Sequence, residues 1–209
     1  LFCQNMLEIA LELSVHDRSY EDLAEKFLEH FLWIAGAMDR IGPNDDAMWD
    51  EEDGFFYDVL RLPDGRAQRL KVRSMVGLLP LCASTVFPPN IFQRLPGFQA
   101  RSTRFILRHQ DLVDNIATPV QPGASGRYLL SPLNESKLRR VLAIMLDEAE
   151  FLSQFGIRSL SRYHLEHPFV PDIHGHKYEV GYVPAESDSG MYGGNSNWRG
   201  PICVPVNLM

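Results

Sequence analysis

The residues best suited to chemistry lie near the end of the sequence, in the sixteen-residue stretch ESDSGMYGGNSNWRGP from Glu186 to Pro201. This stretch holds two acids, two asparagines, four glycines, one tryptophan and one arginine. Acids and amides bind hydroxyl groups in plane, an indole ring offers an apolar face to C–H groups, and glycines let the backbone approach a ligand closely. These are the side chains that a carbohydrate site requires, although composition alone favours the alternative that follows. The alternative is a polar surface loop that packs through its tryptophan.

Five side chains of this stretch are the candidates for sugar contact. Glu186 and Asp188 would accept hydrogen bonds from hydroxyl groups, and Asn197 would both donate and accept them. Trp198 would supply a flat apolar surface, and Arg199 a rigid fork of donors.

Other patterns predict no metal site and no other cofactor. The acid run from Asp50 to Asp53 precedes Gly54, but its spacing does not match a calcium loop, so we expect a tight helix-to-strand turn with solvated acids. The histidines at 164, 167, 174 and 176 fit no zinc spacing. His164 is expected to be an ordinary loop residue or to line a pocket with Arg162 and Tyr163. The sequence has no G-x-S-x-G elbow, no P-loop and no G-x-G-x-x-G turn.

Composition narrows the classes of partner. The chain has 209 residues, 45% of them hydrophobic, and a formal net charge of −7, which disfavours a nucleic-acid partner. No apolar run approaches the ~18 residues of a membrane span, so no membrane partner is expected. Cys3, Cys82 and Cys203 are far apart among apolar neighbours, and we expect three buried free thiols. Unpaired thiols indicate a reducing, cytoplasmic compartment.

Apolar periodicity predicts mostly helices. Residues 2–13 and 19–38 form two helices joined by a short loop, with Ser19 as the N-cap of the second and Gly42-Pro43 after its end. Residues 55–62 and 69–72 predict an inserted β-hairpin that turns at Pro63-Asp64-Gly65. Further helices are expected at 74–85, 98–108 and 135–150, a long loop at 115–133, and little helical periodicity in 156–201.

A weak internal repeat links two irregular stretches. Lys71–Met75 and Gly156–Leu160 share the pattern x-[VI]-R-S-[ML]. In a ring of helical hairpins such loops would open onto one face.

Six segments, in order, resemble glycoside hydrolases related to family 63 and the mannosylglycerate and glucosylglycerate hydrolases. The matching segments are NMLEIALELS, YEDLAEKFLEHF, MWDEEDGFFYDVL, LKVRSMVGLLPL, EFLSQFGIRSLSRYH and ESDSGMYGGNSNWRGP. They extend from Asn5 to Pro201, with less likeness between Ala83 and Asn134.

The resemblance implies a mainly α fold, a partial (α/α)6 toroid of helical hairpins with a small inserted β-hairpin. It implies a single domain over residues 1–209 that is an internal fragment of a larger catalytic domain. The implied reaction is hydrolysis of an α-glucosidic or α-mannosidic bond with inversion, by one carboxylic acid and one carboxylate that activates water. Carbohydrate is the implied partner.

The family motif N-W-R-G-P maps onto Asn197 to Pro201, so Trp198 is the residue implied to stack near the cleaved bond. The family's usual aromatic residue after this motif is replaced by Cys203. The resemblance implies that the general acid lies before Leu1 and the general base after Met209. Glu186 and Asp188 then belong to the pocket wall, and the chain alone is expected to be inactive. The alternatives are a non-catalytic helical-toroid scaffold or glycan-binding fragment, or a lyase or sugar epimerase of the same fold.

Overall fold

A computed structural model describes residues 1–39, 46–114, 116–118, 122–173, 175–184, 202 and 207. Contacts divide the chain into two compact units. Unit 1 consists of Leu1–Ala47 and Pro80–Glu135, and unit 2 of Met48–Leu79 and Ser136–Met209. The expectation that all 209 residues belong to one domain of a larger protein stays a prediction.

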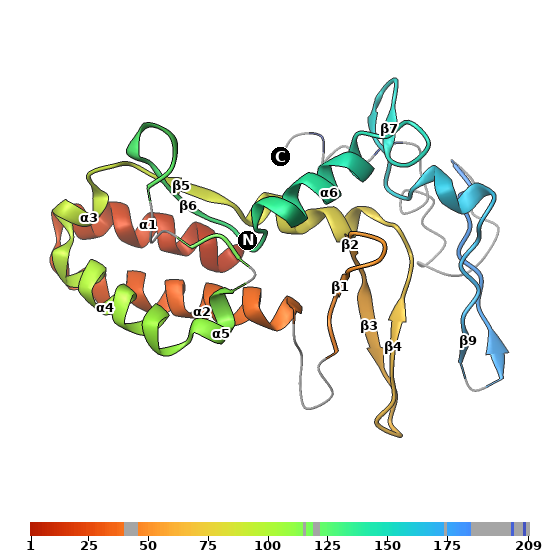
Figure 1. Ribbon diagram of the computed structural model, residues 1–209, viewed down its shortest axis with the longest axis horizontal. Helices are drawn as coiled ribbons and strands as arrows, with labels where there is room; N and C mark the ends of the chain where they lie inside the picture. Colours follow the sequence, from red (N-terminus) through yellow and green to blue (C-terminus); the bar gives the residue numbers. More distant parts are fainter. Residues whose placement is uncertain are drawn as a thin grey trace. The chain divides into compact units, whose positions relative to one another are not determined.

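Unit 1 is built on the predicted helical hairpin. The helices α1 (Phe2–His16) and α2 (Glu21–Asp39) lie side by side, joined by the short 3-10 helix η1 (Arg18–Tyr20) (Figure 1). Ser19 was expected to cap the second helix, but it lies within η1. The N-cap of η1 is Asp17, whose carboxylate accepts a 2.9 Å hydrogen bond from the Ser19 N–H. The remaining helices of unit 1 are α3 (Ile91–Arg94), α4 (Pro96–Arg108), α5 (Gln110–Val113) and η3 (Ala124–Gly126).

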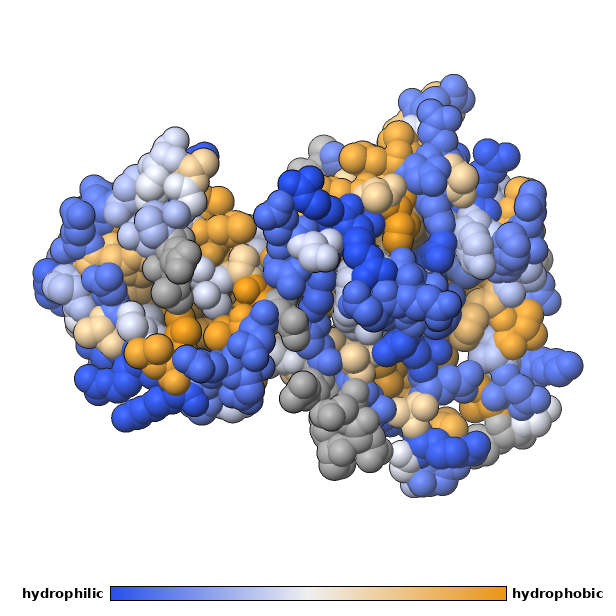
Figure 2. Space-filling model, viewed as in Figure 1, coloured by the Kyte–Doolittle hydropathy of each residue, from blue (hydrophilic) through white to orange (hydrophobic). Residues whose placement is uncertain are grey.

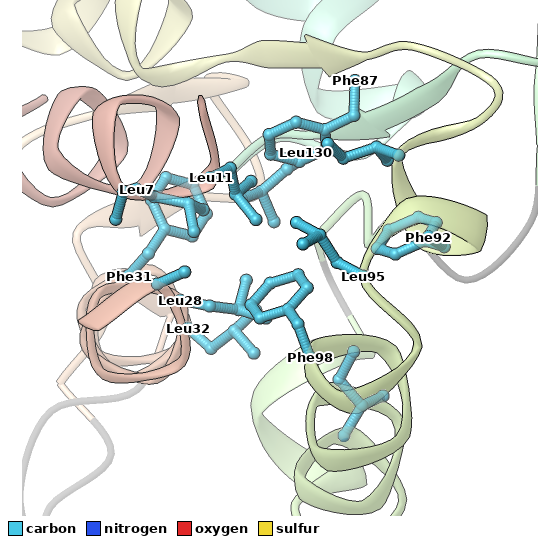
Figure 3. Packing of buried hydrophobic residues seen from close by; sticks show 14 of the residues in the cluster. Leu7, Leu11, Leu28, Phe31, Leu32, Phe87, Phe92, Leu95, Phe98 and Leu130 are labelled. Atoms are coloured by element: carbon cyan, nitrogen blue, oxygen red, sulfur yellow. The ribbon is translucent and has the colours of Figure 1, made fainter. Parts of the chain in front are cut away.

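The core of unit 1 lies between the hairpin, α4 and a small sheet. In Figure 3 Leu7 and Leu11 of α1 and Leu28 of α2 point toward Phe98 of α4 and Leu130. All of these side chains are buried. The predicted helix at 98–108 is confirmed and begins two residues earlier, at a proline in its first turn.

A strand pair in unit 1 corrects the prediction of a long loop at 115–133. The strand β6 (Tyr128–Leu130) pairs with β5 (Thr85–Phe87) in antiparallel register, with Val86 opposite Leu129. Both strands are only three residues long, so neither shows the alternation that would reveal it in the sequence.

Unit 2 contains small hairpins and one α-helix among its described residues. Its strands are β1 (Trp49–Asp50) with β2 (Phe55–Phe56), β3 (Asp58–Arg61) with β4 (Ala67–Leu70), β7 (Leu152–Ser153) with β8 (Gly156–Ile157), and β9 (Asp172–Ile173) with β10 (His176–Lys177). The helices are α6 (Glu135–Met145) and the 3-10 helices η2 (Met75–Ala83) and η4 (Arg162–Leu165). The visible face around α6 is mostly hydrophilic (Figure 2).

The predicted β-hairpin is confirmed as β3 and β4, which pair from Asp58 opposite Leu70 to Arg61 opposite Ala67. Gly65 in its turn has φ of 84°, a conformation that favours glycine. This hairpin turns where Pro63-Asp64-Gly65 indicated.

An aromatic core joins three segments of unit 2. Phe55 stacks on Phe151 with ring centroids 5.7 Å apart, and both side chains are fully buried. Gly77 lies against the same ring, because a Cβ atom there would be 2.3 Å from Cε1 of Phe55. The segments around residues 55, 77 and 151 therefore pack as one unit.

The prediction of a mainly α, partial (α/α)6 toroid is wrong. The described residues form a mixed α/β structure with several two-stranded antiparallel sheets. Two segments that were predicted to be α-helices contain less α-helix than expected. Residues 75–83 form a 3-10 helix that contains Pro80, which has no N–H to donate, and the helix that begins at Glu135 ends at Met145. None of the described helices is long and apolar enough to cross a membrane.

Candidate functional site

The five predicted sugar-contact residues, Glu186, Asp188, Asn197, Trp198 and Arg199, lie outside the described residues. Cys203 and His174 lie outside them too. The roles assigned to these residues therefore stay predictions.

Unit 2 contains a dense group of charged and polar side chains, which we call the Arg73 cluster. It joins three segments of the chain: residues 50–57, residues 69–73 and residues 150–164. Its members are Asp50, Asp53, Tyr57, Arg69, Lys71, Arg73, Glu150, Ser161 and His164.

Arg73 lies at the centre of the cluster, and its side chain is only 16% exposed. Its guanidinium forms an ion pair with Glu150, and its Nε donates a 3.2 Å hydrogen bond to the hydroxyl of Tyr57. One terminal nitrogen lies 3.8 Å from an oxygen of Asp53, and the guanidinium carbon lies 4.4 Å from the centroid of the Tyr163 ring. Arg73 thus contacts both of the other segments.

The acidic turn corrects part of the expectation of a turn between helix and strand with solvated acids: Glu51 and Glu52 are exposed as expected, but Asp53 is half-buried. It connects β1 to β2, and Asp50 is buried. An oxygen of Asp50 lies 2.7 Å from Arg69 and 3.0 Å from Lys71. Lys71 also lies 3.1 Å from Asp53, which accepts a 2.9 Å hydrogen bond from the Tyr57 hydroxyl.

The environment of Asp50 favours its ionised form. Burial alone would raise the pKa of this carboxyl group. The hydrogen bond from the Asp53 N–H, together with Lys71 and Arg69, outweighs burial and lowers the pKa below its usual value. Asp50 is therefore suited to accept hydrogen bonds and not to donate a proton at neutral pH.

Glu150 joins the arginine to the opposite segment. Its carboxylate pairs with Arg73 and accepts a hydrogen bond from the Ser161 hydroxyl. Its backbone carbonyl accepts hydrogen bonds from the Arg162 N–H at 3.0 Å and from the Arg158 guanidinium at 3.3 Å. This carboxylate is therefore a fixed structural acceptor.

The two copies of the weak sequence repeat lie against each other. Ser74 and Leu160 form an antiparallel bridge, the Met75 N–H donates to the Ser159 carbonyl at 2.8 Å, and the Ser161 N–H donates to the Arg73 carbonyl at 2.8 Å. The arginines of both copies converge on Glu150: Arg73 pairs with its carboxylate and Arg158 with its carbonyl. The repeat was the one signal in the sequence that pointed to this cluster.

His164 is a buried structural residue, and its ring bonds to the backbone on both sides. Its Nε2 accepts a 2.8 Å hydrogen bond from the Arg73 N–H, so Nδ1 must carry the proton, and it donates to the His167 carbonyl at 2.9 Å. Burial, with the positive charge of Arg73 as a further contribution, lowers the pKa of His164 against the opposing effect of the His167 carbonyl. The ring is thus held neutral.

We expect stability to fall as pH decreases below about 6.5, the ordinary histidine pKa, because the unfolded chain then binds a proton that folded His164 refuses. The loss continues until pH reaches the lowered pKa of the folded state. Urea unfolding between pH 5 and 8 measures this slope, and the variant His164→Gln, although less stable, should show a shallower one. An equal slope in the variant would contradict this role.

The described residues include no group of three histidine, cysteine or acidic side chains placed to hold a metal ion. Cys3 and Cys82 are unpaired, but both are half-buried, so the expectation of fully buried thiols is wrong for these two. A small pocket in unit 1 is lined mainly by Leu7, Leu28, Phe92, Phe98 and Tyr128, and it includes none of the predicted site residues.

The chain is similar to a protein of Saccharomyces cerevisiae (strain ATCC 204508 / S288c) named "Uncharacterized protein YMR196W". The two are 43% identical over 220 aligned residues, which include all of this chain and 20% of the yeast protein. The chain thus spans about a fifth of its relative's length. No family model matches the chain. No solved structure matches it.

Proposed function

We propose that this chain is part of a glycoside hydrolase that cleaves an α-glucosidic or α-mannosidic bond with inversion, and that it supplies residues of the sugar pocket. In this proposal Trp198 stacks on the sugar ring, Arg199 and Asn197 bind its hydroxyl groups, and Glu186 and Asp188 brace the pocket wall. The acid and base of the reaction come from other parts of a longer protein. The yeast relative is about five times the length of this chain, so a sequence of this kind does occur within a longer protein.

The convergence of the matching segments carries this proposal. Three segments that resemble the glycosidase family are 48–60, 70–81 and 150–164, and they are distant in the sequence. Their polar side chains meet in the Arg73 cluster, and their aromatic and glycine residues meet around Phe55. Segments that contribute to one site must be neighbours in the structure, and these three segments are.

The carboxylates of the cluster fit a supporting role in this proposal. Asp50, Asp53 and Glu150 each lie in an ion pair with a cationic side chain. An inverting glycosidase needs one carboxylic acid that donates a proton and one carboxylate that contacts water. Acids already engaged with lysine and arginine are better suited to hold the pocket wall in place.

The same ion pairs favour a second candidate, a protein that binds a glycan without cleaving it. Cys203, in place of the family's aromatic residue, favours it as well. In either case we propose a cytoplasmic location, which the unpaired state of Cys3 and Cys82 supports.

Turnover of α-glucosides and α-mannosides tests the proposal. The full-length protein is expected to cleave one of these classes, and the 209-residue chain alone is expected to cleave neither. Binding without turnover by the full-length protein would favour the glycan-binding alternative. Turnover by the chain alone would show that the acid and base lie within it.

Removing the proposed sugar platform, by Trp198→Ala in the full-length protein, should lower kcat/KM by at least about tenfold, or about 1.4 kcal/mol. Trp33→Ala is the matched control, because Trp33 is a half-exposed tryptophan on α2 of unit 1 and is not among the predicted sugar-contact residues. Steady-state kinetics on the preferred glycoside measures both variants. Unchanged kcat/KM in Trp198→Ala would contradict the stacking role.

A further inference from the structure

The pocket in the core of unit 1 has room for a small molecule. Side chains from α1, α2, α3, α4 and both strands of the pair β5–β6 line it. Its volume is about 70 Å³, and because one water molecule needs about 10–15 Å³, it holds on the order of five to seven non-hydrogen atoms. Figure 3 shows four of the side chains that surround it, Leu7, Leu28, Phe92 and Phe98.

Aromatic rings form much of the pocket wall. The rings of Phe92 and Phe98 are stacked with centroids 6.3 Å apart, and the Tyr128 ring meets Phe92 edge-on at 4.7 Å. Such rings make favourable contacts with an apolar or aromatic group. Among the described residues that line the pocket, none has a charged side chain. A charged ligand would lose its hydration here without an ion pair in return, so the wall fits a neutral ligand.

The helix α4 supplies the polar part of the wall. Gln99, Ser102 and Thr103 line the pocket from successive turns of this helix. Gln99 and Thr103 are exposed to solvent, so they lie at the mouth of the pocket, whereas Ser102 is only 6% exposed. Ser102 thus places a hydroxyl group inside the pocket.

The hydroxyl of Ser102 has no hydrogen-bond partner in the part of the chain that the structure describes. A buried hydroxyl usually has one, because leaving the bond unmade costs free energy. Ser14 on α1 shows the bond that a buried helical serine can make, since its hydroxyl donates to the Ala10 carbonyl, one turn earlier, at 2.6 Å. Ser102 does not make the corresponding bond to Phe98, so its hydroxyl is available to a ligand in the pocket.

We propose that this pocket binds a small neutral molecule that has one ring and one hydroxyl or carbonyl group. The ring lies against Phe92, Phe98 and Tyr128, and the polar group forms a hydrogen bond with the Ser102 hydroxyl. A sugar does not fit this description, because its several hydroxyl groups would face the aromatic wall without partners. The pocket is therefore a second site, and this inference does not depend on the proposed function.

Phenol and toluene are the probes for this site, since they share a ring and a size and differ in one hydroxyl group. Saturation-transfer NMR with the full-length protein measures the dissociation constant of each, and the wild type is expected to bind both. Ser102→Ala should weaken phenol binding about three- to tenfold, the usual effect of losing one hydrogen bond, and change toluene binding by less than about twofold. Ser14→Ala is the matched control and should change neither.

Two further measurements locate the ligand. Ser102→Leu places a longer apolar side chain in the pocket, so binding of both probes should be lost, and urea unfolding at pH 7 checks that this variant is folded. Hydrogen exchange of the wild type, followed by mass spectrometry, needs no substitution. Saturating phenol should slow exchange in the peptide that contains α4 and leave the peptide that contains α6 of unit 2 unchanged.

The unpartnered state of the Ser102 hydroxyl can be tested without a ligand. Ser102→Ala and Ser14→Ala both replace a buried helical serine of unit 1 by the better helix former. Only Ser14→Ala loses a hydrogen bond, so it should have the lower urea midpoint of the two. Equal midpoints would contradict the unpartnered state.

Each binding outcome decides one claim. Unchanged phenol affinity in Ser102→Ala would overturn the role of Ser102. Phenol binding that survives in folded Ser102→Leu, or unchanged exchange in α4, would overturn the location. A wild-type protein that binds neither probe would overturn the proposal as a whole, whether or not that protein cleaves glycosides.

Discussion

Arg73→Ala is expected to lower the free energy of unfolding by about 3 kcal/mol, the lower end of the cost of removing one partner of a buried ion pair, because this pair is mostly but not fully buried. The substitution leaves Glu150, whose side chain is 12% exposed, without its cation. It also removes the donor to Tyr57 and a positive charge near Asp53. Urea unfolding at pH 7 measures the loss. Three segments meet at Arg73, so the transition should also become less cooperative.

Arg66→Ala is the matched control for this prediction. Arg66 pairs with Asp64 at 2.8 Å, but its side chain is 71% exposed, and exposed pairs contribute about 0–1 kcal/mol. The two variants remove the same side chain from an ion pair and differ mainly in burial. Similar losses in both would contradict the central role assigned to Arg73.

Phe55→Ala is expected to cost about 3–5 kcal/mol, because it opens a cavity in the core of unit 2. The ring is fully buried, stacks on Phe151 and lies 5.4 Å, centroid to centroid, from the ring of Tyr57. Gly77 on η2 packs directly against the Phe55 ring and has no side chain that could fill the cavity. Thermal and urea unfolding should both show the loss.

Phe155→Ala provides the comparison for this core substitution. Phe155 lies between β7 and β8 and is 71% exposed, so its removal should change stability by no more than about 0.5 kcal/mol. A small loss in Phe55→Ala would show that the three segments do not share a core.

The sequence predicted correctly those helices and turns whose formation depends on residues close to one another along the chain. The apolar stripe of residues 19–38 predicted α2, and Pro63-Asp64-Gly65 predicted the turn between β3 and β4. The pairing of β5 with β6 was missed, because it joins residues about forty positions apart through two very short strands. The toroid prediction rested on the resemblance and not on helical periodicity. The strand pairs β7–β8 and β9–β10 form short hairpins where a toroid would have helices.

The Arg73 cluster shows why a site is harder to predict than a helix. Asp50 looked like one of four solvated acids, and only the distant Arg69 and Lys71 explain its burial. The shared pattern around Arg73 and Arg158 did indicate a relation between two segments, but not that they would pair. For the sugar-contact residues 186–199 the prediction stands on composition and resemblance.

The configuration of the released sugar tests the central claim most directly. The full-length protein is mixed with an α-glucoside or α-mannoside, and proton NMR follows the anomeric signals before mutarotation. An inverting enzyme releases the β-anomer first, and this account predicts that result. Initial release of the α-anomer, or no turnover of either class of substrate, would contradict it.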